Sequence, residues 1–153
     1  MTQEKKFALL RIAFGLVWAV DAAFKWLPAV RGNIVGVLAQ ALDGQPAWEA
    51  AWIHVWVNIA NYNPALFGTG IAVVETLLAL ALIFGIFPRL ALWCGLLFAL
   101  LVWSVPQGFG GPYAADSTDI DSGLIYALVF VALILGNAWR SLSLSSSLLK
   151  RFA

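Results

Sequence analysis

Four long apolar stretches divide the chain, separated by shorter polar or proline-containing segments. A helix needs roughly 20 predominantly apolar residues to cross the hydrocarbon core of a bilayer. Prolines stand at the edges of these stretches, where helices tolerate them. The pattern predicts an all-α integral membrane protein whose single domain, residues 1–153, is a four-transmembrane-helix bundle. The helices are expected at about residues 7–27, 65–87, 90–105 and 120–139. The tight turn at Phe87-Pro88-Arg89 predicts that the second and third helices are antiparallel neighbours.

Residues 29–63 lie between the first two apolar stretches and contain two shorter helical patterns, at 33–42 and 47–60. Each is too short to span a bilayer. The second carries an apolar stripe with the 3.6-residue period of a helix, formed by Trp48, Trp52, Val55, Trp56 and Ile59. Tryptophan favours the headgroup level of a membrane, where its ring is buried and its N–H group remains hydrated. We therefore expect an interfacial helical segment between helices one and two that lies on the outer leaflet and caps the bundle as a lid.

Composition agrees with a lipid environment. Hydrophobic residues make up 62% of the chain and charged residues 11%, against about 45–50% and about 25% in soluble domains. The formal net charge of +1 gives no reason to expect a nucleic-acid partner. One cysteine, Cys94, and one histidine, His54, cannot supply a disulfide, a haem held by two histidines, or the ligands of zinc or an iron–sulfur cluster. No haem, metal or iron–sulfur cluster is expected within the chain, and Cys94 is expected to be a small buried hydrophobe.

Positive charges fall unevenly on the two sides of the predicted bundle. Seven of the nine lysines and arginines belong to the N-terminus, the second loop and the C-terminus: Lys5, Lys6, Arg11, Arg89, Arg140, Lys150 and Arg151. Lys25 and Arg31 lie toward the other side, which also collects acidic residues, Glu49 among them. Cytoplasmic loops of membrane proteins carry the excess of Lys and Arg. We therefore expect a multi-pass protein of the cell inner (plasma) membrane with both termini in the cytoplasm.

Three ionisable side chains lie inside predicted spans and are the candidate catalytic residues: Asp21, Lys25 and Glu75. A charged group inside a membrane is costly unless it is paired or hydrated, so each is a candidate for function. Asp21 and Lys25 are four residues apart, share a helix face and can pair. Glu75 shares its face with small residues, which let membrane helices approach closely. The cluster is expected either to fix helix pairing or to form a polar pocket that binds a ligand or passes protons.

The face of the first helix that carries the charged pair also carries Phe14 and Trp18. This face is expected to turn toward the bundle. Leu16 and Val20 lie on the opposite face and are expected to meet lipid. Phe14 and Trp18 are therefore candidates for contacts with a bound ligand next to the charged cluster.

Further candidates for ligand binding lie in the fourth helix and in the lid. Tyr126 lies in the outer half of the fourth helix, where it can hydrogen-bond a ligand or Glu75. Asp119 stands near the start of that helix, where Thr118 or Asp119 is a candidate N-cap, and capping alone is an explanation for Asp119 or Asp121. His54 is interpreted either as a solvated or structural residue of the lid helix or as a ligand contact.

Three runs of sequence, in the first, second and fourth predicted helices, form a set. The first is Arg11-Ile-Ala-Phe-Gly-Leu-Val-Trp18, continued by Asp21 and Lys25-Trp26. The second runs from Glu75 through Gly85 to Arg89-Leu90. The third runs from Thr118-Asp119 through Gly123 and Tyr126 to Phe130. In this order the three runs resemble the DoxX/DoxD family of small membrane proteins.

The resemblance implies a four-helix membrane bundle that is associated with redox metabolism. DoxD-like proteins are described as quinone-reactive subunits of a thiosulfate:quinone oxidoreductase, and other relatives accompany soluble redox enzymes. We therefore expect a membrane subunit of a respiratory or sulfur-oxidising system that interacts with quinone in the outer half of the bundle. Nothing in the chain stores electrons, so they must come from a redox partner protein or directly from the substrate.

In this hypothesis three aromatic side chains stack on the quinone ring: Phe14, Trp18 and Trp52. Three polar side chains are the expected hydrogen-bond donors to its carbonyl oxygens: Lys25, Tyr126 and His54. Two carboxyl groups exchange protons with it: Glu75 and Asp21. Two alternatives stay open, a non-enzymatic partner or assembly subunit that docks a redox enzyme, and a carrier for a small solute or anion. A homo-oligomer also stays open.

Overall fold

The computed structural model describes residues 1–112 and 120–144, and every regular element in this part of the chain is helical. The α-helices are α1 Gln3–Lys25, α2 Pro28–Gly32, α3 Ile34–Gln40, α4 Ala47–Tyr62, α5 Pro64–Phe84, α6 Pro88–Ser104 and α7 Ser122–Leu135. A short 3-10 helix, η1, covers Gly108–Gly110. The all-α prediction is confirmed.

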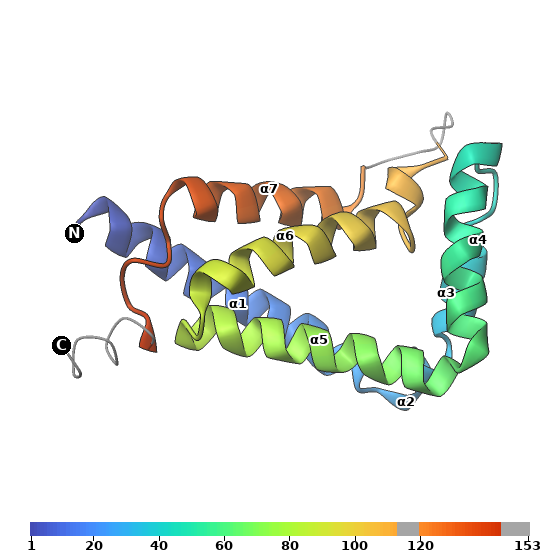
Figure 1. Ribbon diagram of the computed structural model, residues 1–153, viewed down its shortest axis with the longest axis horizontal. Coiled ribbons are helices and arrows are strands. Elements are labelled where there is room, and N and C mark those ends of the chain that lie inside the picture. Colours follow the sequence, from blue (N-terminus) through green and yellow to red (C-terminus); the bar gives the residue numbers. More distant parts are fainter. Residues whose placement is uncertain (113–119, 145–153) are drawn as a thin grey trace.

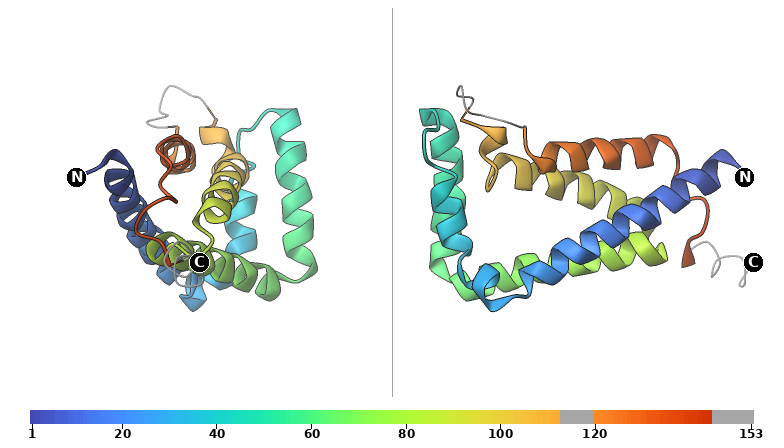
Figure 2. Two further views of the ribbon diagram at one scale, coloured as in Figure 1. Left: turned by 60° about the vertical axis from the view of Figure 1, so that its left-hand side comes forward. Right: turned by 180° about the vertical axis from the view of Figure 1, so that it is seen from behind.

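Four long helices run along the long axis of the molecule, and α3 and α4 cross one end of them as a lid (Figure 1). Within the bundle, α1 packs mainly along α5, and α6 packs mainly along α7. Further views show that these two pairs lie farther apart at the lid end than at the opposite end (Figure 2). Helices α5 and α6 are antiparallel, as the short turn between them predicts, but each packs chiefly on another helix.

Glycines explain this choice of partners. A Cβ at Gly15 would lie 2.9 Å from both Leu82 Cβ and Ile83 Cγ1, so the backbones of α1 and α5 are in close approach. Between α6 and α7, a Cβ at Gly95 would collide with the ring of Phe130. Each helix pair is therefore in close contact at a position where one member has no side chain.

Helices α1 and α5, with 23 and 21 residues, are long and apolar enough to cross a membrane. Helices α6 and α7 are also apolar but have 17 and 14 residues. All four predicted stretches thus fold as helices, although α7 begins later than predicted. Its N-cap is Asp121, with a positive φ of 68°. Of the candidates for capping, Asp121 is therefore the N-cap and not Thr118 or Asp119, which lie outside the described residues.

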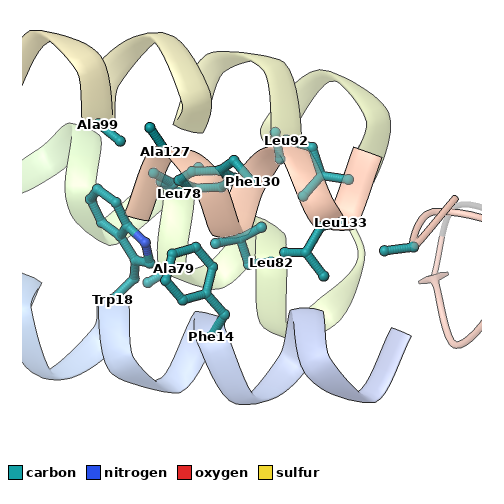
Figure 3. Close-up of a cluster of buried hydrophobic side chains, with 12 residues drawn as sticks. Phe14, Trp18, Leu78, Ala79, Leu82, Leu92, Ala99, Ala127, Phe130 and Leu133 are labelled. Carbon is teal, nitrogen blue, oxygen red and sulfur yellow. The ribbon is translucent and has the colours of Figure 1, made fainter. Parts of the chain in front are cut away.

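The two faces of α1 are as predicted. Phe14 and Trp18 are buried in the core, where they pack among side chains of α5, α6 and α7 (Figure 3). Leu16 and Val20 point away from the bundle and are 56% and 58% exposed. An apolar residue exposed to this degree on a long helix is the pattern expected where lipid covers the outer surface.

The bundle end opposite the lid is closed around Arg11, which is fully buried. Its Nε donates to the carbonyl oxygen of Leu82 at 2.9 Å, in the last turn of α5. Its Nη1 and Nη2 donate to the carbonyl oxygens of Ala138 at 2.8 Å and Leu142 at 2.6 Å, both beyond the end of α7. A positive charge at helix C-terminal ends meets the negative end of the helix dipole. The sequence predicts the face of Arg11 but not this anchoring role.

The lid helix α4 exposes two of its three tryptophans. Trp48 is 64% exposed and Trp52 is 39% exposed, whereas Glu49, Ile53 and Ala60 are buried on the inner face. Of the stripe predicted from the sequence, Trp48, Val55 and Ile59 are thus exposed, whereas Trp56 packs against a buried cluster that includes Leu38 and Val105, and Trp52 reaches Ser104 of α6. Helix α4 lies across the bundle end as expected of a cap and keeps an apolar outer face.

Candidate functional site

Three charged side chains join the end of α1 to the middle of α5. Lys25 Nζ lies 3.1 Å from Asp21 Oδ1 and 3.5 Å from Glu75 Oε2. The side chain of Glu75 is 2% exposed, against 37% for Asp21 and 27% for Lys25. The structure thus brings together the three charged residues singled out in the sequence. The cluster is closed around Glu75 and open beside the two residues of α1.

Helix geometry and small residues position this cluster. Asp21 and Lys25 are one helical turn apart and therefore share a face. On α5, the buried Ala72 and Ala79 flank Glu75 and leave room for α1 to lie against it. Trp26 Nε1 donates to Thr76 Oγ1 at 3.0 Å, which ties the end of α1 to α5.

Aromatic rings from α1, α6 and α7 pack inside the bundle; Figure 3 shows those of Phe14, Trp18 and Phe130. The Trp18 ring centroid lies 5.6 Å from that of Tyr126 and 5.9 Å from those of Phe98 and Phe130. The Phe14 centroid lies 5.5 Å from that of Tyr126 and 5.0 Å from that of Phe130. These separations are in the range of favourable aromatic pairs, so the five rings form one aromatic cluster.

The aromatic cluster adjoins the charged cluster along α1. The ring of Tyr126 contacts those of Phe14 and Trp18. Trp18, which the Tyr126 ring touches, is three residues from Asp21 and shares the helix face of Asp21 and Lys25. Of the predicted ligand-binding residues, Phe14, Trp18 and Tyr126 therefore lie at one site with the charged cluster.

Two buried polar atoms of this site have no hydrogen-bond partner among the residues that the structure describes: Trp18 Nε1 and Glu75 Oε2. Glu75 Oε2 is within ion-pair distance of Lys25 Nζ but accepts no hydrogen bond. Buried polar groups are normally paired, and an unpaired one costs about 1–3 kcal/mol. The site is therefore incomplete by itself, and a polar ligand or an ordered water would complete it.

Trp52 and His54 are not part of this site. Within residues 1–112 and 120–144, no hydrogen bond, ion pair or ring contact joins either of them to the charged or the aromatic cluster. Trp52 Nε1 donates to Ser104 Oγ at 3.2 Å, and His54 is exposed on α4. Both belong to the lid, which crosses the bundle end, so their predicted contacts with a ligand at Glu75 lack support. Asp119, the remaining predicted contact, lies outside the described residues.

Trp52 instead lines an apolar groove of about 340 Å³ between α4, α6 and η1. Leu100, Trp103 and Phe109 are among the other side chains that line it. The groove has little polar surface beyond Ser104, so it suits a hydrocarbon chain rather than a polar group.

A second buried carboxyl group, Glu49, lies under the lid. It is 4% exposed, and its Oε1 has no hydrogen-bond partner in the described part of the chain. A Cβ at Gly108 would lie 3.2 Å from this oxygen, so Glu49 packs against the backbone near η1. Burial raises the pKa of Glu49 above its ordinary value. The sequence analysis counted Glu49 only as an outer charge; its helical spacing from Ile53 and Ala60 is the signal that places it on the inner face.

Among the described residues, no three His, Cys, Asp or Glu side chains come together in a way that could hold a metal ion. Cys94 is exposed on α6, so the prediction that it is buried is wrong. Leu92, Gly95 and Ala99 occupy the buried face of that helix, which leaves Cys94 on the outer one.

No family model matches the chain, and neither the curated proteins nor the solved structures contain a match to it. The resemblance to the DoxX/DoxD family therefore stays a prediction. The chemistry of the site follows from its own geometry. A buried carboxyl group beside an ammonium group can bind a polar group and exchange a proton with it. The neighbouring rings can pack against a flat apolar ring.

Proposed function

We propose that this protein is a membrane subunit of a redox system and that it binds a quinone at the charged cluster of Asp21, Lys25 and Glu75. The observation that carries the proposal is the wholly buried Glu75, paired with Lys25 and adjoining an aromatic cluster. The resemblance to the DoxX/DoxD family points in the same direction. Quinone reduction consumes protons as well as electrons, and carboxyl groups can supply protons.

The membrane arrangement that goes with this function is a four-span bundle formed by α1, α5, α6 and α7. Helix α7 has 14 residues, or about 21 Å of length, against a hydrocarbon core of about 30 Å. The turns that follow α7 and the region around η1 therefore enter the membrane, or the bilayer is thinner around this pair. The four spans lie within the inner (plasma) membrane. The lid lies on the outer face of this membrane.

The orientation of the protein in the membrane follows from the positive charges at the two ends of the bundle. Lys5, Lys6, Arg89 and Arg140 all stand at the end opposite the lid, where Arg140 Nη1 lies 3.3 Å from Glu4 Oε1. The lid end has Lys25 and Arg31. The end rich in Lys and Arg faces the cytoplasm. Both termini are then cytoplasmic, and α4 lies along the outer leaflet with its exposed tryptophans at headgroup level.

In this arrangement the quinone ring reaches the site beside Asp21 and Lys25, the two partly exposed members of the cluster. Lys25 donates a hydrogen bond to a carbonyl oxygen of the quinone, and Phe14, Trp18 and Tyr126 provide apolar ring contacts. Glu75 and Asp21 exchange protons with the ring oxygens. Electrons come from a partner protein or directly from the substrate, since no residue of this chain stores them.

Titration of the detergent-purified protein with a short-chain benzoquinone tests the proposal. Tryptophan fluorescence should be quenched with saturation, because Trp18 lies at the site. Glu75→Gln and Lys25→Met should each weaken binding about tenfold, the loss expected for a hydrogen bond to a charged group. Matched controls are Glu4→Gln and Lys6→Met, at the far end of α1 from the cluster, where Glu4 is partly exposed and Lys6 is exposed. Fluorescence that does not respond to quinone, or that responds equally in all variants, would contradict the proposal.

The outward apolar face of α4 favours a second candidate, a non-enzymatic partner or assembly subunit that docks a redox enzyme. Trp48, Val55 and Ile59 are all about half exposed or more on this face. This candidate predicts that a redox enzyme co-purifies with the protein and is lost on Trp48→Ala combined with Val55→Ser. It also predicts that Glu75→Gln changes stability alone. A carrier for a small solute or anion has the least support, because aromatic rings fill the core beside Lys25.

A further inference from the structure

The polar side chains that line the apolar groove between α4, α6 and η1 are already bonded within the chain. Trp52 Nε1 donates to Ser104 Oγ at 3.2 Å, and Ser104 Oγ donates to the carbonyl oxygen of Leu101 at 3.2 Å. Trp103 Nε1 donates to the carbonyl oxygen of Ile120 at 2.9 Å. An indole N–H group has a single hydrogen to donate. These side chains therefore present apolar surface to the groove, and an apolar occupant fits it.

Packed aromatic rings form the lid end of the groove. The ring of Phe109 in η1 lies between two tryptophans, with its centroid 5.1 Å from that of Trp103 and 5.5 Å from that of Trp48. The ring of Trp52 contributes the wall on α4. These separations are in the range of favourable aromatic pairs. The lid end of the groove therefore has a defined shape.

The groove continues into the outer face of α6. Leu97 and Leu100 line the groove and are both exposed, Leu97 by 66%. They follow the exposed Leu90 and Trp93 at helical spacing. One apolar stripe thus runs along α6 from its first turn into the groove. In the membrane arrangement proposed above, this stripe meets the hydrocarbon chains of the bilayer, so lipid chains have direct access to the groove.

The depth of the groove corresponds to the outer leaflet. Its wall on α6, residues 97–104, extends about 10 Å along the helix. The hydrocarbon part of one leaflet is about 15 Å thick, or about ten residues of an α-helix. Helix α6 ends at Ser104 beside the lid (Figure 1). A chain that begins beside Trp52 at headgroup level therefore follows the groove first and then the stripe as far as about Cys94.

We infer that the groove binds one acyl chain of a phospholipid of the outer leaflet, between Trp52 of the lid and the apolar stripe of α6. The inference rests on the membrane arrangement proposed above and is independent of quinone binding. Because the polar side chains of the groove are bonded to the chain itself, the groove recognises the hydrocarbon chain and not the headgroup.

The isoprenoid tail of a quinone is another hydrocarbon chain that the proposed function would bring to the protein. The charged cluster lies on α1 and α5, whereas the groove lies between α4, α6 and η1. None of the residues that line the groove belongs to the charged or the aromatic cluster. A lipid of the surrounding bilayer is therefore the occupant that we assign to the groove.

Photo-crosslinking of the intact protein in phosphatidylcholine nanodiscs tests the inference. The probe is a trace of phosphatidylcholine with a diazirine on one acyl chain, either near the ester or at the methyl end. The first probe should label Trp52 and residues 100–104 several-fold more than the other outward helix faces. The second should shift the labels along α6 toward Cys94. Phosphatidylglycerol with the same labelled chain should give the same pattern, because the headgroup is not recognised.

Two variants locate the site. Leu97→Trp places a large ring at the open side of the groove and should reduce the labels at Trp52 and residues 100–104 to the level of the other outward faces. Leu128→Trp makes the same change at a residue of α7 that is 60% exposed and does not line the groove. It should leave the labels in the groove unchanged. Glu75→Gln alters the proposed quinone site and should also leave them unchanged.

The outcomes separate this inference from the proposed function. Labels spread evenly over the outward faces of the wild-type protein, or groove labels that Leu97→Trp leaves unchanged, overturn the acyl-chain site while quinone binding stands. Loss of the groove labels on addition of a long-chain quinone assigns the groove to the isoprenoid tail and also overturns it. Absence of labels from all four long helices overturns the membrane arrangement and this inference with it. The wild-type pattern decides the matter even if a variant does not fold.

Discussion

Arg11 and Glu75 are both charged, both buried and both held where α1 meets α5, but their surroundings differ. Each of the three guanidinium nitrogens of Arg11 donates to a backbone carbonyl oxygen within 2.9 Å. Glu75 has one ion-pair partner, Lys25 Nζ at 3.5 Å from Oε2, and in the described part of the chain this oxygen accepts no hydrogen bond. The first charge is satisfied by the chain itself and stabilises the fold. The second is left partly unsatisfied, which is the state expected of a group that meets a ligand.

The largest expected effect is that of Arg11→Met. Three carbonyl oxygens at the closed end of the bundle would lose their donor, and we expect a loss of stability of about 3–5 kcal/mol, as for the removal of one partner from a buried charged network. Thermal unfolding in detergent measures it. The matched control is Arg89→Met. Among the described residues Arg89 makes an exposed cation–π contact with Trp139 at 5.7 Å, and its loss should cost less than about 1 kcal/mol. Equal stability of Arg11→Met and wild type would show that the buried guanidinium is no anchor.

Lys25→Met should have the next largest effect. It leaves Asp21 and Glu75 without a counter-charge, but the partial exposure of Lys25 and Asp21 lets water compensate in part. We expect a loss of about 1–3 kcal/mol. Adding Glu75→Gln removes the uncompensated buried charge, so the double variant should recover stability relative to Lys25→Met. A double-mutant cycle measures this coupling, and strict additivity of the two changes would mean that the ion pair contributes nothing.

Trp18→Phe should change stability little. It keeps an aromatic ring in the core and removes an N–H group that has no partner, so the loss should be below about 1 kcal/mol. Binding of ligand should nevertheless weaken. A large loss of stability together with unchanged ligand binding would show that Trp18, like Arg11, is a purely structural residue.

The smallest effect concerns Glu49, the buried carboxyl group of the lid. Burial raises its pKa above the ordinary value of 4.5, so the folded protein binds a proton there more tightly than the unfolded chain. This contribution to stability is complete below pH 4.5 and is lost as the pH rises through the raised pKa. The melting temperature of wild type should therefore fall, relative to that of Glu49→Gln, as the pH rises over this interval. Parallel pH profiles of the two proteins would show that Glu49 titrates alike in both states.

What the sequence predicts well is the inner face of α1. Phe14, Trp18 and the pair of Asp21 and Lys25 follow the helical period, and period alone decides which side chains turn inward together. The site assembles from that face and from Glu75, which stands out because a carboxyl group is rare within an apolar span. No comparable signal places Trp52 or His54, because the direction in which the lid crosses the bundle end depends on tertiary packing.

The partners of Arg11 lie beyond prediction for another reason. They are backbone carbonyls, which every residue has, and their availability depends on where α5 and α7 end. The start of α7 shows the same limit. An acidic residue before an apolar run is typical of an N-cap, but three acidic residues, Asp116, Asp119 and Asp121, precede this run, and the backbone geometry selects Asp121.

Photoaffinity labelling with an azido-benzoquinone, followed by peptide mapping, tests most directly whether the incomplete site rather than the satisfied one receives the ligand. The account predicts labels on α1 between Phe14 and Lys25 and on α5 near Glu75, with competition by unlabelled quinol. Labels confined to the apolar groove beside Trp52 and Trp103, or spread evenly over the outer faces of the helices, would contradict it.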